Sequence, residues 1–166
     1  MKIMKTAVVY YSMSGNTAQT AEKIAAALGA DLIRIEPVKE YPSKGFKKFL
    51  WGGKSAVMGD TPALQPYRFD GDYDRVIIGT PLWAGTMTPP IRSFIMENKE
   101  KLSGKSIAVF ICCAGGDTTK AFEKLRQSLE VNVLEAQLEL VDPKDKPSES
   151  NEKKLNAFCE QLKATS

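Results

Sequence analysis

Short apolar runs alternate with amphipathic segments along most of the chain. Three of these runs predict strands that are buried on both faces: TAVVYY from residue 6, VII at 76–78 and SIAVFI at 106–111. Two further stretches, DLIRIE at 31–36 and VLEAQLEL at 133–140, predict a second and a fifth strand. The pattern therefore predicts five strands, and the segments between them have room for helices.

Apolar residues at helical spacing fill several of these intervals. One stripe runs from Ala18 to Leu28 and stops at Gly29, a second includes Phe122, Leu125 and Leu129, and a third spans 149–163. Strands that alternate with helices are typical of a parallel sheet covered on both faces. We therefore expect an α/β fold over residues 1–166 as one domain, with a doubly wound, five-stranded parallel sheet in the order 2-1-3-4-5.

The polar segment YYSMSGNT at 10–17 links the first predicted strand to the first predicted helix. Two serines, Asn16 and Thr17 surround Gly15. A helix N-terminus offers unpaired N–H groups and the positive end of the helix dipole, and small hydroxyls add donors without crowding an anion. The segment predicts a phosphate-binding loop, although a polar turn that only caps the helix would contain the same residue types.

Other phosphate loops are excluded by their spacing. The patterns GxxxxGK[ST] and GxGxxG are both absent from 10–17. The GKS at 53–55 has Lys48 where the first glycine is required, and no strand precedes it. A phosphatase loop fails because no arginine follows Cys113 across the turn, and a receiver domain would need acidic residues where Ser12 and Thr80 stand.

The pattern hydroxyl-x-hydroxyl-Gly-Asn-Thr after the first strand resembles the flavodoxin family. The resemblance implies a flavodoxin-like three-layer sandwich whose signature loop binds the terminal phosphate of FMN without lysine or arginine. Neutral donors suit a phosphate that is never transferred, because no charge develops there. The resemblance covers the whole chain, and the absence of an insertion in the fifth strand is typical of the short-chain branch.

A second loop, GTPLWAGTMTPPI at 79–91, follows the third predicted strand in the same way. Pro81 fixes the chain direction, Trp83 offers a flat indole, and Ala84 with Gly85 leaves the backbone open to close approach. The resemblance implies that Trp83 stacks on the flavin ring. The alternative is a core tryptophan, but core strands rarely end in a run of Pro, Gly and Thr.

A third loop, CCAGGDTT at 112–119, follows the fourth predicted strand. Gly115 and Gly116 would let the backbone pass under the pyrimidine edge of a flavin, and Asp117 is expected to cap the next helix. Well-known flavodoxins carry an aromatic residue here on the outer side of the flavin, and this loop has none. Either another residue covers that side, such as Tyr41 or Trp51, or the side is open to a substrate or partner.

The three loops follow the first, third and fourth strands, and parallel sheets of this kind bind ligands at the carboxyl ends of such strands. The residues expected to bind FMN are Ser12, Met13, Ser14, Gly15, Asn16, Thr17, Thr80, Pro81, Leu82, Trp83, Ala84, Gly85, Cys113, Ala114, Gly115, Gly116 and Asp117.

The chain has no histidine, and therefore lacks the commonest general base and metal ligand. We expect no metal site and no catalytic side chain, so any chemistry would come from the bound cofactor. Three cysteines, two of them adjacent, do not make a disulfide framework and favour the cytoplasm. Cys112 and Cys113 alternate across a strand end, which places one toward the core and the other toward the loop, with packing favoured over a redox role.

Charge gives a weaker indication of partners. The chain has 23 basic and 20 acidic residues, whereas electron-shuttling flavodoxins are usually strongly acidic. The stretch 39–57 predicts a basic amphipathic helix that is interrupted by glycines. We hypothesise that its basic edge, which includes Lys44, Lys47 and Lys48, docks a redox partner. No nucleic-acid platform and no membrane segment are expected.

The leading function is FMN binding for transfer of one or two electrons between redox partners. The alternative is an FMN-dependent reductase of quinones or similar acceptors that uses NAD(P)H, favoured by an open outer flavin face. A flavin-free scaffold ranks last. Because the three loops contain few acids, the expected potential is less negative than in acidic flavodoxins.

Overall fold

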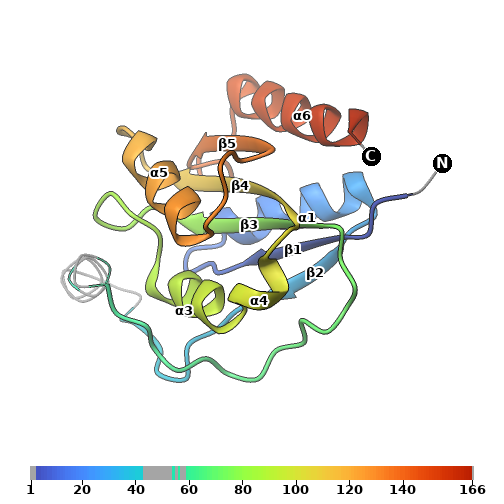
Figure 1. Cartoon of the computed structure of the whole chain (residues 1–166). Coiled ribbons are helices and arrows are strands. Elements are labelled where there is room, and N and C mark those ends of the chain that lie inside the picture. Colours follow the sequence, from blue (N-terminus) through green and yellow to red (C-terminus); the bar gives the residue numbers. More distant parts are fainter. Residues whose placement is uncertain (1–2, 43–53, 55, 57–58, 166) are drawn as a thin grey trace.

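The structure is a computed structural model, and it describes residues 3–42, 54, 56 and 59–165. Its centre is a parallel sheet of five strands in the order β2-β1-β3-β4-β5, with helices on both faces (Figure 1). The strands are β1 (Thr6–Tyr10), β2 (Asp31–Arg34), β3 (Arg75–Pro81), β4 (Ser106–Cys113) and β5 (Ala136–Val141). The predicted fold class and strand order are confirmed.

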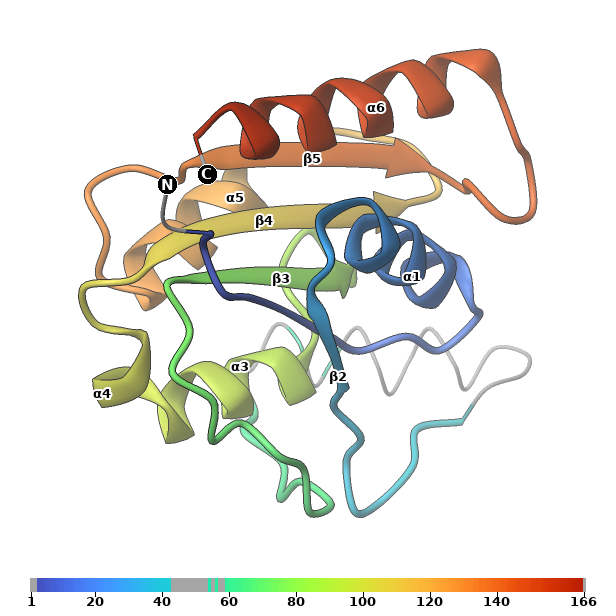
Figure 2. The same cartoon turned by 90° about the vertical axis from the view of Figure 1, so that its right-hand side faces the viewer.

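Each face of the sheet has its own apolar core. Helices α1 (Asn16–Leu28) and α6 (Glu149–Ala164) cover one face, while α3 (Pro89–Glu97), α4 (Lys99–Leu102) and α5 (Thr119–Ser128) cover the other (Figure 2). The central strands β1, β3 and β4 are buried almost throughout, because a parallel sheet with helices on both faces shields both sets of side chains. The apolar runs in the sequence follow from this double burial.

The helix ends also follow local sequence signals. Helix α1 ends as predicted at Gly29, which adopts the left-handed conformation, and α3 begins with two prolines whose missing N–H groups are not needed in a first helical turn. Ser148 caps α6 by accepting the N–H of Asn151. Within the described part of the chain, no helix is both long enough and apolar enough to cross a membrane.

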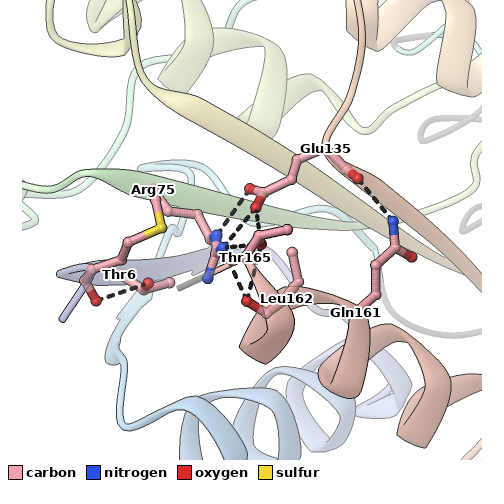
Figure 3. A network of polar contacts seen from close by, with 7 residues as sticks. Thr6, Arg75, Glu135, Gln161, Leu162 and Thr165 are labelled. Atoms are coloured by element: carbon pink, nitrogen blue, oxygen red, sulfur yellow. Dashed lines mark hydrogen bonds and ion pairs between the residues drawn. The ribbon is translucent and has the colours of Figure 1, made fainter. Parts of the chain in front are cut away.

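Two of the expected elements, the fifth strand and the basic helix at 39–57, do not correspond directly to described elements of the structure. The fifth strand runs from Ala136 to Val141 rather than over 133–140; before it, Val133 is exposed and the carboxylate of Glu135 is bonded by Arg75 (Figure 3). The expected basic helix at 39–57, with its docking lysines Lys44, Lys47 and Lys48, falls mostly on residues outside those that the structure describes.

A buried ion pair ties α6 to the amino end of the sheet (Figure 3). Arg75, 1% exposed at the start of β3, donates to Glu135 through Nε at 2.9 Å and Nη2 at 2.6 Å. The same Nη2 donates to the carbonyl of Leu162 at 3.1 Å and to the hydroxyl of Thr165 at 2.8 Å, and Thr165 donates to Glu135 at 2.7 Å. A charge this deeply buried needs such complete pairing.

Replacing Arg75 with methionine should lower the free energy of unfolding by about 3 kcal/mol, because the substitution leaves Glu135 without its cation and frees the end of α6. Urea unfolding followed by circular dichroism measures the loss. The matched control is Arg68→Met, because Arg68 and its partner Asp70 are both exposed and lie 3.8 Å apart. Losing this surface pair should cost less than about 0.5 kcal/mol. Similar losses in both variants would contradict this account.

The same network should make stability depend on pH. Burial raises the pKa of Glu135, but hydrogen bonds from Arg75 and Thr165 outweigh burial and hold that pKa below its ordinary value of 4.5. A carboxyl with a lowered pKa stabilises the fold above pH 4.5 and loses this contribution as the pH falls through its folded-state value. The difference in melting temperature between wild type and Glu135→Gln should therefore narrow below about pH 4.5. A difference that stays constant from pH 7 to pH 3 would argue against the ion pair.

Candidate functional site

The loops after β1, β3 and β4 meet at the carboxyl edge of the sheet. Tyr10 is level with Gly79, and Pro81 is level with Cys112. Backbone hydrogen bonds continue past the strand ends, from the N–H of Tyr11 to Gly79 at 3.2 Å and from the N–H of Leu82 to Cys112 at 3.0 Å. The parallel register thus places side by side the three segments that the sequence predicted as a joint site.

The first loop presents backbone donors at the start of α1. Ser12 is buried, and its hydroxyl oxygen accepts the N–H groups of Gly15 at 3.2 Å and Ala18 at 3.1 Å. Because the oxygen accepts both, its own proton is left to donate to an anion. No acidic residue belongs to the first turn of α1, and the nearby Asp145 carboxylate is bonded to the Asn16 amide at 3.0 Å. This geometry suits an anion such as a phosphate.

Among the remaining residues of the first loop, some are buried or packed against the core and others are exposed to solvent. The side-chain oxygen of Asn16 accepts the N–H of Lys144, and its amide nitrogen donates to the Asp145 carboxylate and to the Ser14 hydroxyl. Asn16 can therefore offer only its backbone N–H to a ligand. Thr17 is buried, Met13 packs against the core, and Ser14 is exposed. The sequence pattern identified the loop but gave no sign that the Asn16 side chain holds a segment about 130 residues away in the chain.

Two cations that the sequence analysis missed touch the carbonyls of this loop. Arg34 of β2 donates to the Ser12 carbonyl at 3.0 Å and also pairs with Glu36. Lys144, after β5, donates to the Ser14 carbonyl at 3.2 Å. Neither residue lies near the loop in sequence, so no local motif could have revealed it.

The second loop is a tight hairpin. Trp83 and Thr86 exchange two backbone hydrogen bonds of 3.0 Å across a two-residue turn, in which Ala84 has φ 50° and Gly85 has φ 76°. Both turn residues are exposed, as close approach of a ligand requires. Thr80 is fully buried, and its hydroxyl donates to the Pro81 carbonyl and accepts the N–H of Thr88, so it braces the loop from within. Leu82 and Pro81 are partly buried.

Trp83 lies between two tyrosines. Its ring meets Tyr11 edge-on at 5.7 Å between centroids and Tyr41 edge-on at 5.2 Å. Burial raises the pKa of Tyr11, so its hydroxyl remains neutral at all physiological pH values. Of the two residues considered for the outer side of the site, Tyr41 is thus beside Trp83, while Trp51 lies outside the described residues.

The third loop is exposed from Ala114 through Asp117, with Gly115 and Gly116 at positive φ. Asp117 accepts the N–H of Thr119 at 2.9 Å, so its carboxylate lies at the first residue of α5, although the N-cap residue of this helix is Thr118. None of these residues is aromatic, so the third loop adds only backbone and small side chains to the site.

The adjacent cysteines differ from expectation. One of the two thiols was expected to face the core and the other to face the loop. In the structure both Cys112 and Cys113 are buried. The Cys113 thiol donates to the Leu140 carbonyl at 3.7 Å. Burial raises the pKa of Cys112 to about 11 and raises that of Cys113 as well. Neither thiol is a ready nucleophile, and packing explains both.

The three loops present groups that suit binding of a ligand. Among the described residues, no cluster of acidic or cysteine side chains could hold a metal ion. The three loops offer backbone N–H groups and small residues beside Trp83, which is partly buried and packs against the core. Such a surface suits a planar ligand with an anionic tail.

Comparison with known proteins agrees with this geometry. The family model described as flavodoxin matches residues 5–146. The chain belongs to the flavodoxin family. Among solved structures similar to this flavodoxin-family chain is a flavoprotein in complex with FMN from Lactobacillus acidophilus NCFM, with a TM-score of 0.72 at 23% identity, covering 86% of this chain and 95% of the other.

Two further structures show how widely this flavodoxin fold is used. A protein from Bacteroides eggerthii DSM 20697, described as a flavoprotein, gives a TM-score of 0.73 at 26% identity and covers 95% of this chain and 96% of its own. The apo form of an NADH:FMN oxidoreductase gives a TM-score of 0.62 at 15% identity, and the match covers 97% of this chain and 89% of the other. The flavodoxin fold thus occurs in proteins described in different functional terms.

The hairpin at Trp83 gives a stability prediction. A non-glycine residue in the left-handed region costs about 1 kcal/mol, so Ala84→Gly should leave the free energy of unfolding unchanged or raise it, whereas Gly85→Ala should lower it by about 1 kcal/mol. Ala63→Gly, at an exposed residue without positive φ, is the matched control and should cost about 0.5 kcal/mol. Chemical denaturation measures all three variants. Equal losses from Ala84→Gly and Ala63→Gly would show that the turn is not strained.

Proposed function

We propose that this protein binds FMN at the carboxyl edge of its sheet and transfers one or two electrons between redox partners. The observation that carries the proposal is the juxtaposition of an anion-binding helix N-terminus with an exposed small-residue hairpin next to Trp83. Membership of the flavodoxin family and the fold shared with an FMN-bound flavoprotein support it.

The residues present fit FMN. The 5′-phosphate would be held by the backbone N–H groups of the first loop and by the Ser12 hydroxyl, whose oxygen already accepts two N–H groups. The ring would lie between the loops at 80–85 and 113–117, with Trp83 as its aromatic neighbour. When bound, FMN supplies reversible transfer of electrons, and the protein supplies binding and electrostatics.

The chain itself contributes two features to electron transfer: a backbone carbonyl that can accept a hydrogen bond, and loops with few acidic residues. The exposed Ala84–Gly85 peptide can turn its carbonyl toward a ring nitrogen and hold a proton there. Asp117 is the single acid in the three loops, so little negative charge opposes reduction. A potential less negative than that of acidic flavodoxins follows from this charge balance.

The second candidate is an NAD(P)H-dependent reductase that passes electrons to a quinone or a similar small acceptor. Its support is the similarity to an NADH:FMN oxidoreductase and the absence of an aromatic residue from the third loop. A nicotinamide ring has to stack directly on the flavin, and a loop of small residues leaves room for that contact. Three cysteines that are free and buried fit either role in a reducing compartment such as the cytoplasm.

The experiment is a titration of the apoprotein with FMN, followed by anaerobic reduction. We expect one FMN per chain, and Trp83→Ala should weaken binding at least tenfold because it removes the aromatic neighbour of the ring. Tyr67→Phe, at a residue whose ring contacts Phe94 of α3, is the control and should bind as wild type does. Failure of the wild-type protein to bind FMN would overturn the proposal.

Reduction separates the two candidates. An electron carrier should be reduced by dithionite in two resolved one-electron steps and should react slowly with NADPH. Rapid bleaching of the flavin by NADPH would instead establish the reductase. The same potentiometric titration gives the second potential, and a value as low as in strongly acidic flavodoxins would contradict the charge argument.

A further inference from the structure

The segment that follows β5 folds back onto the first loop. The Asn16 side-chain carbonyl accepts the backbone N–H groups of Lys144 at 2.8 Å and Asp145 at 3.4 Å, and its amide nitrogen donates to the Asp145 carboxylate at 3.0 Å. Asn16 is itself buried at the first position of α1. One asparagine therefore fixes the backbone of residues 144–145 against the helix N-terminus.

This attachment places an ammonium group on the loop. The Nζ of Lys144 donates to the carbonyl of Ser14 at 3.2 Å. A Cβ atom built on Gly15 would lie 3.0 Å from the same Nζ, so the lysine passes directly over the loop glycine. Both neighbours belong to the loop whose N–H groups are proposed to hold the phosphate.

The charges around the loop make Lys144 distinct. Arg34 also touches a loop carbonyl, but Glu36 pairs with it. Lys146, two residues further along, pairs with Asp142 at 3.6 Å. Among the described residues Lys144 forms no salt bridge, and Asp145 directs its carboxylate to the Asn16 amide, so the ammonium charge of Lys144 is not neutralised by a direct partner.

We propose that Lys144 supplies positive charge to the phosphate of FMN and so makes the site select phosphorylated flavin over riboflavin. The inference rests on the function proposed above. A phosphate carries close to two negative charges at neutral pH, and neutral N–H donors alone leave that charge without a counter-ion. The lysine comes from a segment remote from the signature loop, which by its own pattern contains no cation.

The test compares binding of FMN and riboflavin to the apoproteins of wild type, Lys144→Gln and Lys146→Gln, followed by quenching of flavin fluorescence. At about 20 mM salt, Lys144→Gln should weaken FMN binding about five- to tenfold and change riboflavin binding less than twofold. The loss should shrink at about 0.5 M salt, because screening removes the contribution of an exposed charge. Lys146→Gln should alter neither ligand, and Lys144→Arg should restore FMN binding to within about threefold.

Each other outcome overturns the inference. Equal weakening of FMN and riboflavin by Lys144→Gln would mean that the lysine only shapes the loop. Unchanged FMN binding would mean that its charge is not felt at the phosphate. A wild-type protein that binds neither flavin would overturn the proposed function itself, whereas normal FMN binding with no effect of Lys144→Gln overturns the inference alone.

Discussion

The parallel register of β1, β3 and β4 is the constraint on which the site depends. Parallel neighbours end at the same edge of the sheet, so three loops from distant parts of the chain emerge together. The hydrogen bonds beyond the strand ends, from Tyr11 to Gly79 and from Leu82 to Cys112, extend this alignment into the loops. A shift of one residue in any of these strands would move a whole loop and exchange the faces of its side chains.

The two ends of the sheet have different roles. At the amino end, Arg75 and Glu135 form a buried network in which every strong donor and acceptor has a partner, and this network anchors α6. At the carboxyl end, the backbone donors of the first loop and the turn at Ala84 face outward. Binding surface is thus concentrated where the strands end, and the deeply buried charge is kept at the opposite edge, where it cannot perturb a bound cofactor.

Local signals were sufficient to predict the five strands and the helices α1, α5 and α6, whereas no helix was predicted over α3 and α4. Double burial produces apolar runs that identify β1, β3 and β4, and Gly29 correctly marks the end of α1. The predicted start of β5 was three residues too early, because Val133 and Leu134 are apolar in the sequence but Val133 is exposed in the structure and β5 begins at Ala136. Contacts between residues far apart in sequence set such details, and a single sequence does not contain them.

Contacts between distant segments also account for the site residues that the sequence pattern did not predict. The motif around Asn16 predicted a phosphate loop, but the bonds from Asn16 to the backbone at 144–145 depend on the path of the chain after β5. Likewise, Tyr41 reaches Trp83 because the segment after β2 returns toward the sheet edge. If FMN binds as proposed, the signature loop would specify the kind of ligand, whereas residues from the outer segments would determine the charge at its phosphate and the access to its ring. Two proteins with the same signature loop can differ in function for this reason. One can leave room for a nicotinamide ring to stack on the flavin, whereas the other allows only electron transfer to a redox partner.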